Sequence, residues 1–536
     1  MSEYPPPISK LPVFDSVVFA TENLTTADAS ALYLKRAGVA TSVATSTTFS
    51  SSITAPTFIG ALTTTSAITS NITSGVLANI TDTGSGFTSV VRVHPFNSTA
   101  TTAGQTAIGS LAGITSQGVC GVAIGANAGN NTQGLNSIAI GREAGSTTQG
   151  ANAVAIGTSA GLSNQISNAI AIGINAGTTS QGSSSVAIGL YAGNSGQLFT
   201  AVAIGSNAGQ NTQGGNGVAI GTSSGTNTQG TASIAIGLNS ATTSQGIQSV
   251  AIGRNTATTS QGSQSVAIGQ SSGTTSQGIA SVAIGSNSGN NLQGAGSIAI
   301  GTNAGSGVVA SGTNFQGAGS IAIGQGSGQN TQGISSVAVG INSGSTSQAT
   351  LSVAIGSGAG NSNQATQSVA IGSGAGQTTQ GANAVSIGVS AGNNTQSAGS
   401  IAIGASCGLT TQGSNSVAIG FGCAQTNQGA NAVAIGNGAG GTNQSAGAIA
   451  IGVSAGSGIT TPQGLNSVCI GNGAGNASAT AGSICINASG VATNPNQIGC
   501  FIRPIRAGVL GSSFVPALPA SVLYYDTVNF EILRTT

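Results

Sequence analysis

The stretch Val202-Ala-Ile-Gly-Ser-Asn-Ala-Gly-Gln-Asn-Thr-Gln-Gly-Gly-Asn-Gly217 ends where its opening phrase begins again, at Val218-Ala-Ile-Gly221. The phrase recurs through residues 105–487, and its closing glycine, called the marker glycine below, returns with a 16-residue period that two longer steps interrupt. The last marker position is occupied by Asn487, which makes 24 repeats. A fixed period of this kind is typical of a repeat architecture, in which each unit stacks on the one before it.

Each repeat contains a minimal alternating strand. Alternation with period two sends the residues one and three before the marker glycine to one face, and the residue two before it to the other. The residues one and three before the marker glycine are Val or Ile in nearly every repeat, so we expect them to form the apolar core of stacked strands. The core residues predicted on this basis are Val122, Ile124, Val154, Ile156, Val186 and Ile188.

A repeat of this length leaves room for two short strands and two tight corners. The sequence therefore predicts an all-β fold, a parallel β-roll or β-solenoid in which single turns become stable only by stacking. With strands about 4.8 Å apart, 24 turns would make a rod roughly 115 Å long.

Glutamine stands eight residues after the marker glycine in most repeats. Amides stacked in register can donate to one neighbour and accept from the other, which predicts a glutamine ladder along the rod. The alternative is a solvent-facing glutamine chosen for its turn chemistry. The ladder prediction names Gln117, Gln133, Gln149, Gln165, Gln181 and Gln213.

The two longer steps preserve this column, because Gln316 lies eight residues before Gly324 and Gln463 eight before Gly471. The extra residues near 306–312 and 456–461 are therefore predicted to be bulged loops, past which the stack continues.

The position two before the marker glycine is alanine in 21 of the 24 repeats. A small apolar column suggests close approach of another chain, and we interpret it as the subunit interface of a homotrimer. The alternative is that alanine lines a second internal layer of a monomeric solenoid. The interface prediction names Ala123, Ala139, Ala155, Ala171, Cys469 and Cys485.

The phrase Ser-Val-Ala-Ile-Gly-x-x-Ala resembles the head repeat of trimeric autotransporter adhesins. That resemblance covers residues 105–487, which is most of the chain, and implies a left-handed parallel β-roll with three chains packed side by side. The chain departs from the family in its longer period, and it has no recognisable neck, heptad stalk or membrane anchor. The resemblance therefore predicts the architecture of the chain better than its biological role.

Composition argues against several classes of function. Only Arg142 and Arg254 are basic within residues 105–487, so no stripe of positive charge is available for nucleic acid. The single histidine is His94, and no aspartate lies between Asp82 and Asp526. We therefore expect neither an enzyme nor a cofactor or metal site.

The cysteines follow the repeat period. One full repeat separates Cys407 from Cys423, and likewise Cys469 from Cys485, so each pair should stack on adjacent turns within reach of a disulfide. The alternative is that each is a small buried thiol. For Cys120 and Cys500, no other cysteine occupies the equivalent position of an adjacent repeat.

The start of the chain has no profile of a secretory signal peptide, and no apolar run in the sequence is long enough to predict a membrane span. Residues 24–38 are predicted to form a short helix, with Thr25 and Asp28 as a capping box and Gly38 as the stop.

Residues 8–19 and 24–35 resemble the N-terminal attachment segments of repeat-containing fibre proteins from large DNA viruses and tailed phages. Residues 500–506 and 523–532 resemble the segment that often precedes a self-cleaving chaperone domain in such fibres. The resemblance implies attachment residues at Pro12, Phe14, Phe19, Leu32 and Tyr33. The aromatic residues expected to cap the open end of the roll are Phe501, Tyr524, Tyr525 and Phe530.

The chain is thus expected to have four parts: an attachment segment (1–38), a Thr/Ser-rich β connector (39–104), the repeat rod (105–487) and a C-terminal cap or assembly segment (488–536). The function predicted is a structural fibre or filament on a virion surface or outside the cell. Its partners would be copies of itself, as a homotrimer and head to tail, and a capsid or host surface. The alternative is an adhesin-type module that recognises a receptor or glycan through the polar face of the roll.

Overall fold

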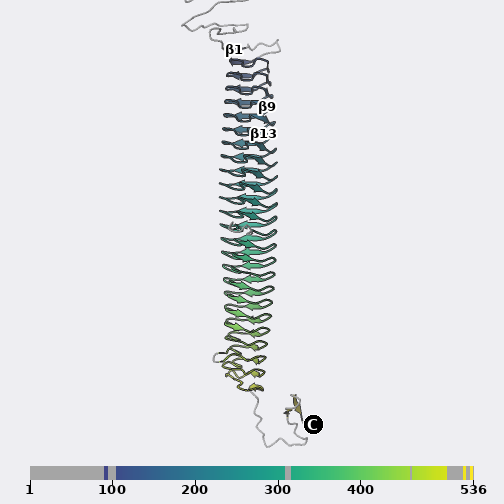
Figure 1. Cartoon of the computed structure of the whole chain (residues 1–536), viewed down its shortest axis with the longest axis vertical. Helices are drawn as coiled ribbons and strands as arrows, with labels where there is room; N and C mark the ends of the chain where they lie inside the picture. Colours follow the sequence, from purple (N-terminus) through teal and green to yellow (C-terminus); the bar gives the residue numbers. More distant parts are fainter. Residues whose placement is uncertain are drawn as a thin grey trace, which may run out of the picture. The chain divides into compact units, whose positions relative to one another are not determined.

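The computed structural model describes residues 90–93, 104–307, 315–458, 461–503, 523–526 and 531–534, all within the unit Ile72–Thr536. Across this part of the chain the secondary structure is strands and turns, without a helix. The turns lie over one another in chain order (Figure 1). The all-β parallel solenoid with 16-residue turns that the sequence predicts is confirmed.

Among these residues, 26 strands form one long sheet, which we call the Val/Ile sheet. Equivalent residues of successive turns pair directly, as Val202 pairs with Val218 and Ile204 with Ile220. The strand β1 (Val90–Val93) is the exception, because it runs antiparallel to β2. The parallel strands are β2 (Thr106–Gly109), β4 (Val122–Ile124), β6 (Ile138–Ile140), β8 (Val154–Ile156), β10 (Ile170–Ile172), β12 (Val186–Ile188), β14 (Val202–Ile204), β16 (Val218–Ile220), β18 (Ile234–Ile236), β20 (Val250–Ile252), β22 (Val266–Ile268), β24 (Val282–Ile284), β26 (Ile298–Ile300), β27 (Ile321–Ile323), β29 (Val337–Val339), β31 (Val353–Ile355), β32 (Val369–Ile371), β34 (Val385–Ile387), β36 (Ile401–Ile403), β38 (Val417–Ile419), β40 (Val433–Ile435), β41 (Ile449–Ile451), β42 (Val468–Ile470), β43 (Ile484–Asn487) and β44 (Cys500–Arg503).

A second layer, which we call the Gln sheet, is built from shorter strands that end at the glutamine of each turn. Isolated bridges such as Gln293 to Gln316 and Gln444 to Gln463 carry its pairing across turns where no strand is assigned. Its strands are β3 (Ser116–Gln117), β5 (Thr132–Gln133), β7 (Thr148–Gln149), β9 (Ser163–Gln165), β11 (Thr179–Gln181), β13 (Ser195–Gln197), β15 (Thr212–Gln213), β17 (Thr228–Gln229), β19 (Ser244–Gln245), β21 (Ser260–Gln261), β23 (Ser276–Gln277), β25 (Leu292–Gln293), β28 (Thr331–Gln332), β30 (Ser347–Gln348), β33 (Thr379–Gln380), β35 (Thr395–Gln396), β37 (Thr411–Gln412) and β39 (Asn427–Gln428).

The stack continues through both insertions. Strand β26 pairs directly with β27, and β41 with β42, although each pair is separated by a longer piece of chain. The stack also extends past Asn487, because β44 pairs in parallel with β43. A separate antiparallel hairpin is formed by β45 (Leu523–Asp526) and β46 (Glu531–Arg534).

Successive turns are joined by backbone hydrogen bonds in both directions. The Val202 N–H donates to the Gly217 carbonyl of the next turn at 2.8 Å, and the Gly205 N–H donates to the Ile188 carbonyl of the preceding turn at 2.8 Å. Each turn except those at the ends is therefore held from two sides, which is the only way so short a unit can satisfy its backbone.

The marker glycines make this close stacking possible. Gly340 has φ +126°, and a Cβ placed on it would lie 2.7 Å from the carbonyl oxygen of Gly356 in the next turn. A side chain at this corner would meet backbone, so the column remains glycine until Asn487 replaces it near the end of the stack.

Candidate functional site

The interior of the roll is built from alanine, serine and glutamine, and this overturns the predicted core. Ala123, Ala139, Ala155 and Ala171 are completely buried inside the single chain, so they cannot form the subunit interface. Cys469 and Cys485 occupy the same column and are likewise buried. The structure instead agrees with the alternative reading, in which alanine lines an internal layer.

The branched residues predicted as core lie on the opposite, outer face of the same strands. They are only half-buried, at Val122, Ile124, Val154, Ile156, Val186 and Ile188. The reason is space. A Cβ placed on Gly129 would lie 2.8 Å from the Gln133 amide oxygen and 3.4 Å from the Ala123 Cβ. One glutamine with small neighbours already fills the narrow interior, and a Val or Ile there would overpack it.

The glutamine column points into this interior. The Gln213 amide nitrogen donates to the Val202 carbonyl at 2.8 Å, and the Gln197 amide nitrogen donates to the Gln213 side-chain oxygen at 3.0 Å. The first kind of bond recurs from turn to turn and ties the Gln sheet to the Val/Ile sheet. Gln117 and Gln133 likewise donate to the Thr106 and Val122 carbonyls, both at 2.8 Å.

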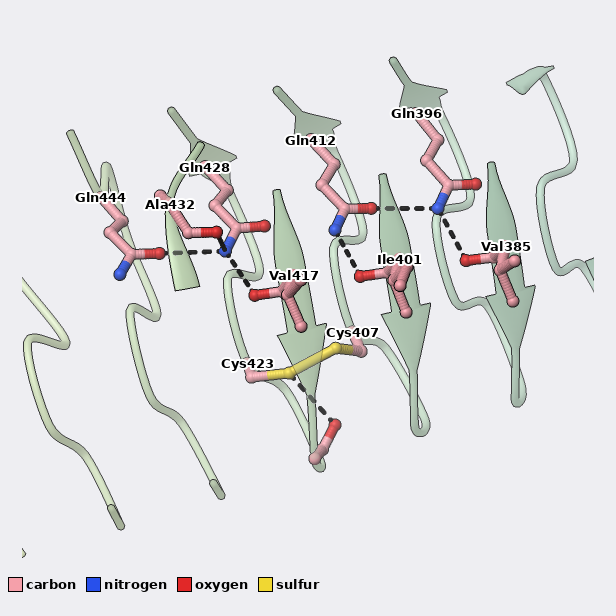
Figure 2. The surroundings of a disulfide bond; sticks show 11 residues. Val385, Gln396, Ile401, Cys407, Gln412, Val417, Cys423, Gln428, Ala432 and Gln444 are labelled. Atoms are coloured by element: carbon pink, nitrogen blue, oxygen red, sulfur yellow. Dashed lines mark hydrogen bonds between the residues drawn. A yellow bond between two sulfur atoms is a disulfide. The ribbon is translucent and has the colours of Figure 1, made fainter. Parts of the chain in front are cut away.

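The ladder bonds between stacked glutamines are present in two main runs and are interrupted between them. They join Gln149–Gln165, Gln165–Gln181, Gln181–Gln197, Gln197–Gln213, Gln316–Gln332, Gln364–Gln380, Gln380–Gln396, Gln396–Gln412 and Gln428–Gln444. Figure 2 shows two of these bonds and the donation of Gln396, Gln412 and Gln428 to the strand carbonyls.

Between the two runs of ladder bonds, serine hydroxyl groups join some of the neighbouring turns. Serine replaces alanine three residues after the marker glycine, and Ser272 and Ser288 donate to the Ala283 and Ala299 carbonyls of the following turn at 2.8 and 2.6 Å. The side-chain oxygens of Gln229, Gln245, Gln261, Gln277 and Gln293 accept no hydrogen bond there. The hydrogen bond from the glutamine side-chain nitrogen to a strand carbonyl is therefore the regular one, and the bond between stacked glutamines is additional.

The outer face of the Val/Ile sheet is an extensive apolar surface. Ile204, Ile355 and Ile470 are 36%, 38% and 37% exposed, and most of their equivalents in other turns are half-buried. Within residues 104–503, these two columns hold no charged side chain. At about 4.8 Å per turn and roughly 10 Å across three strand residues, the face covers about 1,100 Å². That is well above the few hundred Å² usual for a monomeric protein.

Further large apolar side chains border this face. Leu190, Leu238, Ile341 and Phe421 each follow a marker glycine directly and are 44%, 46%, 53% and 65% exposed. They widen the apolar face at the corner that ends each strand of the Val/Ile sheet.

The two cysteine pairs differ. Cys407 and Cys423 form a disulfide between adjacent turns, with their Cα atoms 4.9 Å apart (Figure 2). Cys469 and Cys485 are register partners in β42 and β43 but remain buried thiols. Burial raises the pKa of Cys469 from 9.0 to about 12, the nearby Cys485 adds to the rise, and a hydrogen bond with Gln463 opposes it. Burial also raises the pKa of Cys485.

The predicted attachment residues Pro12, Phe14, Phe19, Leu32 and Tyr33, and the predicted helix at residues 24–38, lie outside the described residues. So does Phe530 of the predicted cap, while Tyr524 and Tyr525 belong to the hairpin strand β45.

Phe501 lies in the last strand of the long sheet, β44, in register with Cys485 at the end of the alanine column. The sequence holds a signal for this extra strand that the prediction missed, because the step from Asn487 to Arg503 equals the repeat period.

No family model, curated protein or solved structure matches the chain. In the part of the chain that the structure describes, no helix is long and apolar enough to cross a membrane. In the same residues, no group of three or more His, Cys, Asp or Glu side chains is arranged to hold a metal ion.

Proposed function

We propose that the repeat region is a structural rod that associates with copies of itself through the outer face of the Val/Ile sheet. The observation that carries the proposal is the uncharged Val/Ile face, whose side chains are only half-buried or exposed from turn to turn. This replaces the alanine column as the interface. Three chains, with their Val/Ile faces turned toward one axis, would remove all three faces from water.

The energy available from this face is large enough for stable association. Burying about 1,100 Å² of apolar surface at about 25 cal/mol per Å² contributes on the order of 25 kcal/mol per chain. The loss of translational and rotational freedom on association opposes this by about 4–15 kcal/mol. Since each turn adds its own share, association strengthens with every repeat.

The rod would work through its length and stiffness. Backbone bonds join each turn to both neighbours, and the interior glutamines tie the two sheets together. A fibre or filament on a virion surface or outside the cell, of the kind the end segments resemble, is the role that suits such a rod. Docking of the N-terminal segment of one rod on the C-terminal region of another would add rods head to tail.

Charge placed on the outer face tests this function. We expect the purified wild-type chain to sediment at three times its monomer mass. The double variant Val202→Lys/Val218→Lys should weaken or abolish association, because buried ammonium groups are strongly disfavoured. The matched control Thr212→Lys/Thr228→Lys changes exposed residues of the Gln sheet and should remain trimeric. A monomeric wild-type chain, or equal behaviour of the two variants, would refute the proposal.

A second candidate is recognition of a neutral polar ligand such as a glycan. An open polar hollow of about 390 Å³ lies at the corner of four adjacent turns, where Gly358 and Gly374 leave space beside four amide side chains. Those amides belong to Asn342, Asn361, Gln377 and Asn393. Binding of oligosaccharides on a glycan array, lost in Asn393→Ala, would support this function.

A further inference from the structure

We propose that Cys469 and Cys485 form a second disulfide between adjacent turns, at the C-terminal end of the long sheet. The two residues are direct register partners in the parallel strands β42 and β43. Neighbouring residues of this kind have Cα atoms about 4.8 Å apart, within the range of about 4.4–6.8 Å that disulfides span. The existing disulfide has the same 16-residue separation and a Cα distance of 4.9 Å.

The pair lies apart from the remaining cysteines, because Cys469 and Cys485 are buried whereas Cys120 and Cys500 are exposed. Both side chains are completely buried in the alanine column. The Cys485 thiol donates weakly to the Thr493 carbonyl at 3.4 Å. A Cβ placed on Gly475 would lie 2.5 Å from the Cys469 sulfur, so this sulfur is enclosed by the corner of its own turn. Cys500 stands on the other face of the last strand, because its position alternates with that of Phe501.

The burial of both thiols also protects them from reagents. A thiol must lose its proton to react, and the buried Cys469 holds its proton well above neutral pH. The bond therefore forms while the chain folds, or when the last turns open, and not by attack of a reagent on the closed roll. Opening is easiest at this end, since a terminal turn has a neighbour on one side only.

The chemistry is thiol–disulfide exchange with a small disulfide oxidant. One cysteine thiolate attacks a sulfur of the oxidant, forms a mixed disulfide and releases one small thiolate. The second cysteine thiolate attacks the protein sulfur of that mixed disulfide and releases the other small thiolate, which takes up a proton. Two protein thiols are oxidised, and one oxidant disulfide is reduced to two thiols.

The proposed disulfide would hold turns near the C-terminal end of the long sheet together. A bond between Cys469 and Cys485 links the turns that carry β42 and β43, next to the final strand β44. Like the Cys407–Cys423 disulfide, it would join two adjacent turns in the C-terminal part of the roll, so that these turns could not unfold independently of each other.

The test uses the full chain with Cys407→Ala and Cys423→Ala, which leaves four of the six cysteines. The protein is refolded from guanidinium in a buffer of reduced and oxidised glutathione, so that access does not limit the reaction. It is then denatured, alkylated with N-ethylmaleimide, digested with elastase and analysed by mass spectrometry. We expect a peptide that joins Cys469 to Cys485, and alkylation of two thiols in place of four.

The matched control adds Cys469→Ala, which restores the residue found in this column in most repeats. It should give no such peptide, and Cys485 should be alkylated or carry glutathione. Amide exchange of residues 472–503 should be slower by on the order of 100-fold in the oxidised than in the reduced parent, as expected for a loop of this length, and unchanged in the control. Refolded protein in which Cys469 and Cys485 are alkylated separately, or pair with Cys120 or Cys500, would overturn the proposal.

Discussion

The strictest requirement of the structure falls on the marker glycines, and Gly340→Ala tests it. The backbone there has φ +126°, a region that L-residues rarely adopt, and the added Cβ would approach the Gly356 carbonyl carbon and oxygen to 2.8 and 2.7 Å. The turn can relieve this overlap only by moving away from its neighbour. That movement strains the bonds from the Gly340 N–H to the Ile323 carbonyl and from the Gly356 N–H to the Val339 carbonyl, both 2.8 Å long.

The expected loss of stability is about 2–6 kcal/mol. Backbone strain at such a φ contributes about 1–3 kcal/mol, and two weakened inter-turn bonds contribute about 0.5–1.5 kcal/mol each. The matched control is Gly319→Ala, where φ is +64° and the nearest atom, the Ser335 hydroxyl, is 3.7 Å from the new Cβ. The equivalent residues of other turns, Ala232 and Ala280, already have φ 55°. The control should therefore cost only about 1–2 kcal/mol.

Urea unfolding and amide exchange by mass spectrometry measure both variants. Because stability in a stacked repeat is a sum of local terms, the loss should appear as faster exchange in the turns around residues 323–356. Equal behaviour of Gly340→Ala and Gly319→Ala would refute the close stacking of turns described above.

Three further predictions concern the interior. Gln213→Met should destabilise the roll by about 2–3 kcal/mol, because the Val202 carbonyl loses its donor and the Gln197 amide its acceptor; urea unfolding measures the loss. Ala203→Leu should destabilise by more than about 1 kcal/mol through overpacking, whereas Val202→Leu on the outer face should leave unfolding of the dissociated chain nearly unchanged. Burial raises the pKa of Cys469 from 9.0 to about 12, so the unfolded chain releases a proton that the folded chain keeps; this contribution to stability is complete below pH 9 and falls as the pH rises from 9 to about 12. Unfolding of the reduced protein across this range should show the decline, and Cys469→Ala should lack it.

Much of the fold follows from the period alone. The spacing of the marker glycines predicts parallel turns of one repeat each, and the glutamine column correctly predicts that the stack passes through both insertions. Both predictions depend only on the regular spacing of residues, which can be read directly from a repeated sequence. The strand β44 shows the limit of this approach, because its phrase Cys500-Phe-Ile-Arg503 keeps the spacing but not the residues of the repeat.

The alternation of strand residues was predicted correctly, but the faces were assigned the wrong way round. Period two separates Val202 and Ile204 from Ala203, yet it does not say which side faces inward. The expectation that the larger apolar residues are internal is wrong here, because the interior of so short a turn has room for Gln213 and small residues only. The decisive quantity is the distance between the two sheets, which the pattern of a single strand does not contain.

The same reversal explains why the predicted interface was misplaced. Alanine columns are typical of close approach, and in this roll the approach is between the two sheets of one chain. The apolar residues left outside, in the columns of Val202 and Ile204, then become the surface that another chain would cover.

The most direct test of this account is a cross-section of the purified rod by cryo-electron microscopy, at a resolution that separates the side-chain columns. We predict that alanine and glutamine fill the interior of each roll, and that the Val/Ile faces of three chains meet at a common axis. Density in which Val and Ile fill the interior of a single roll, with alanine turned outward, would contradict it.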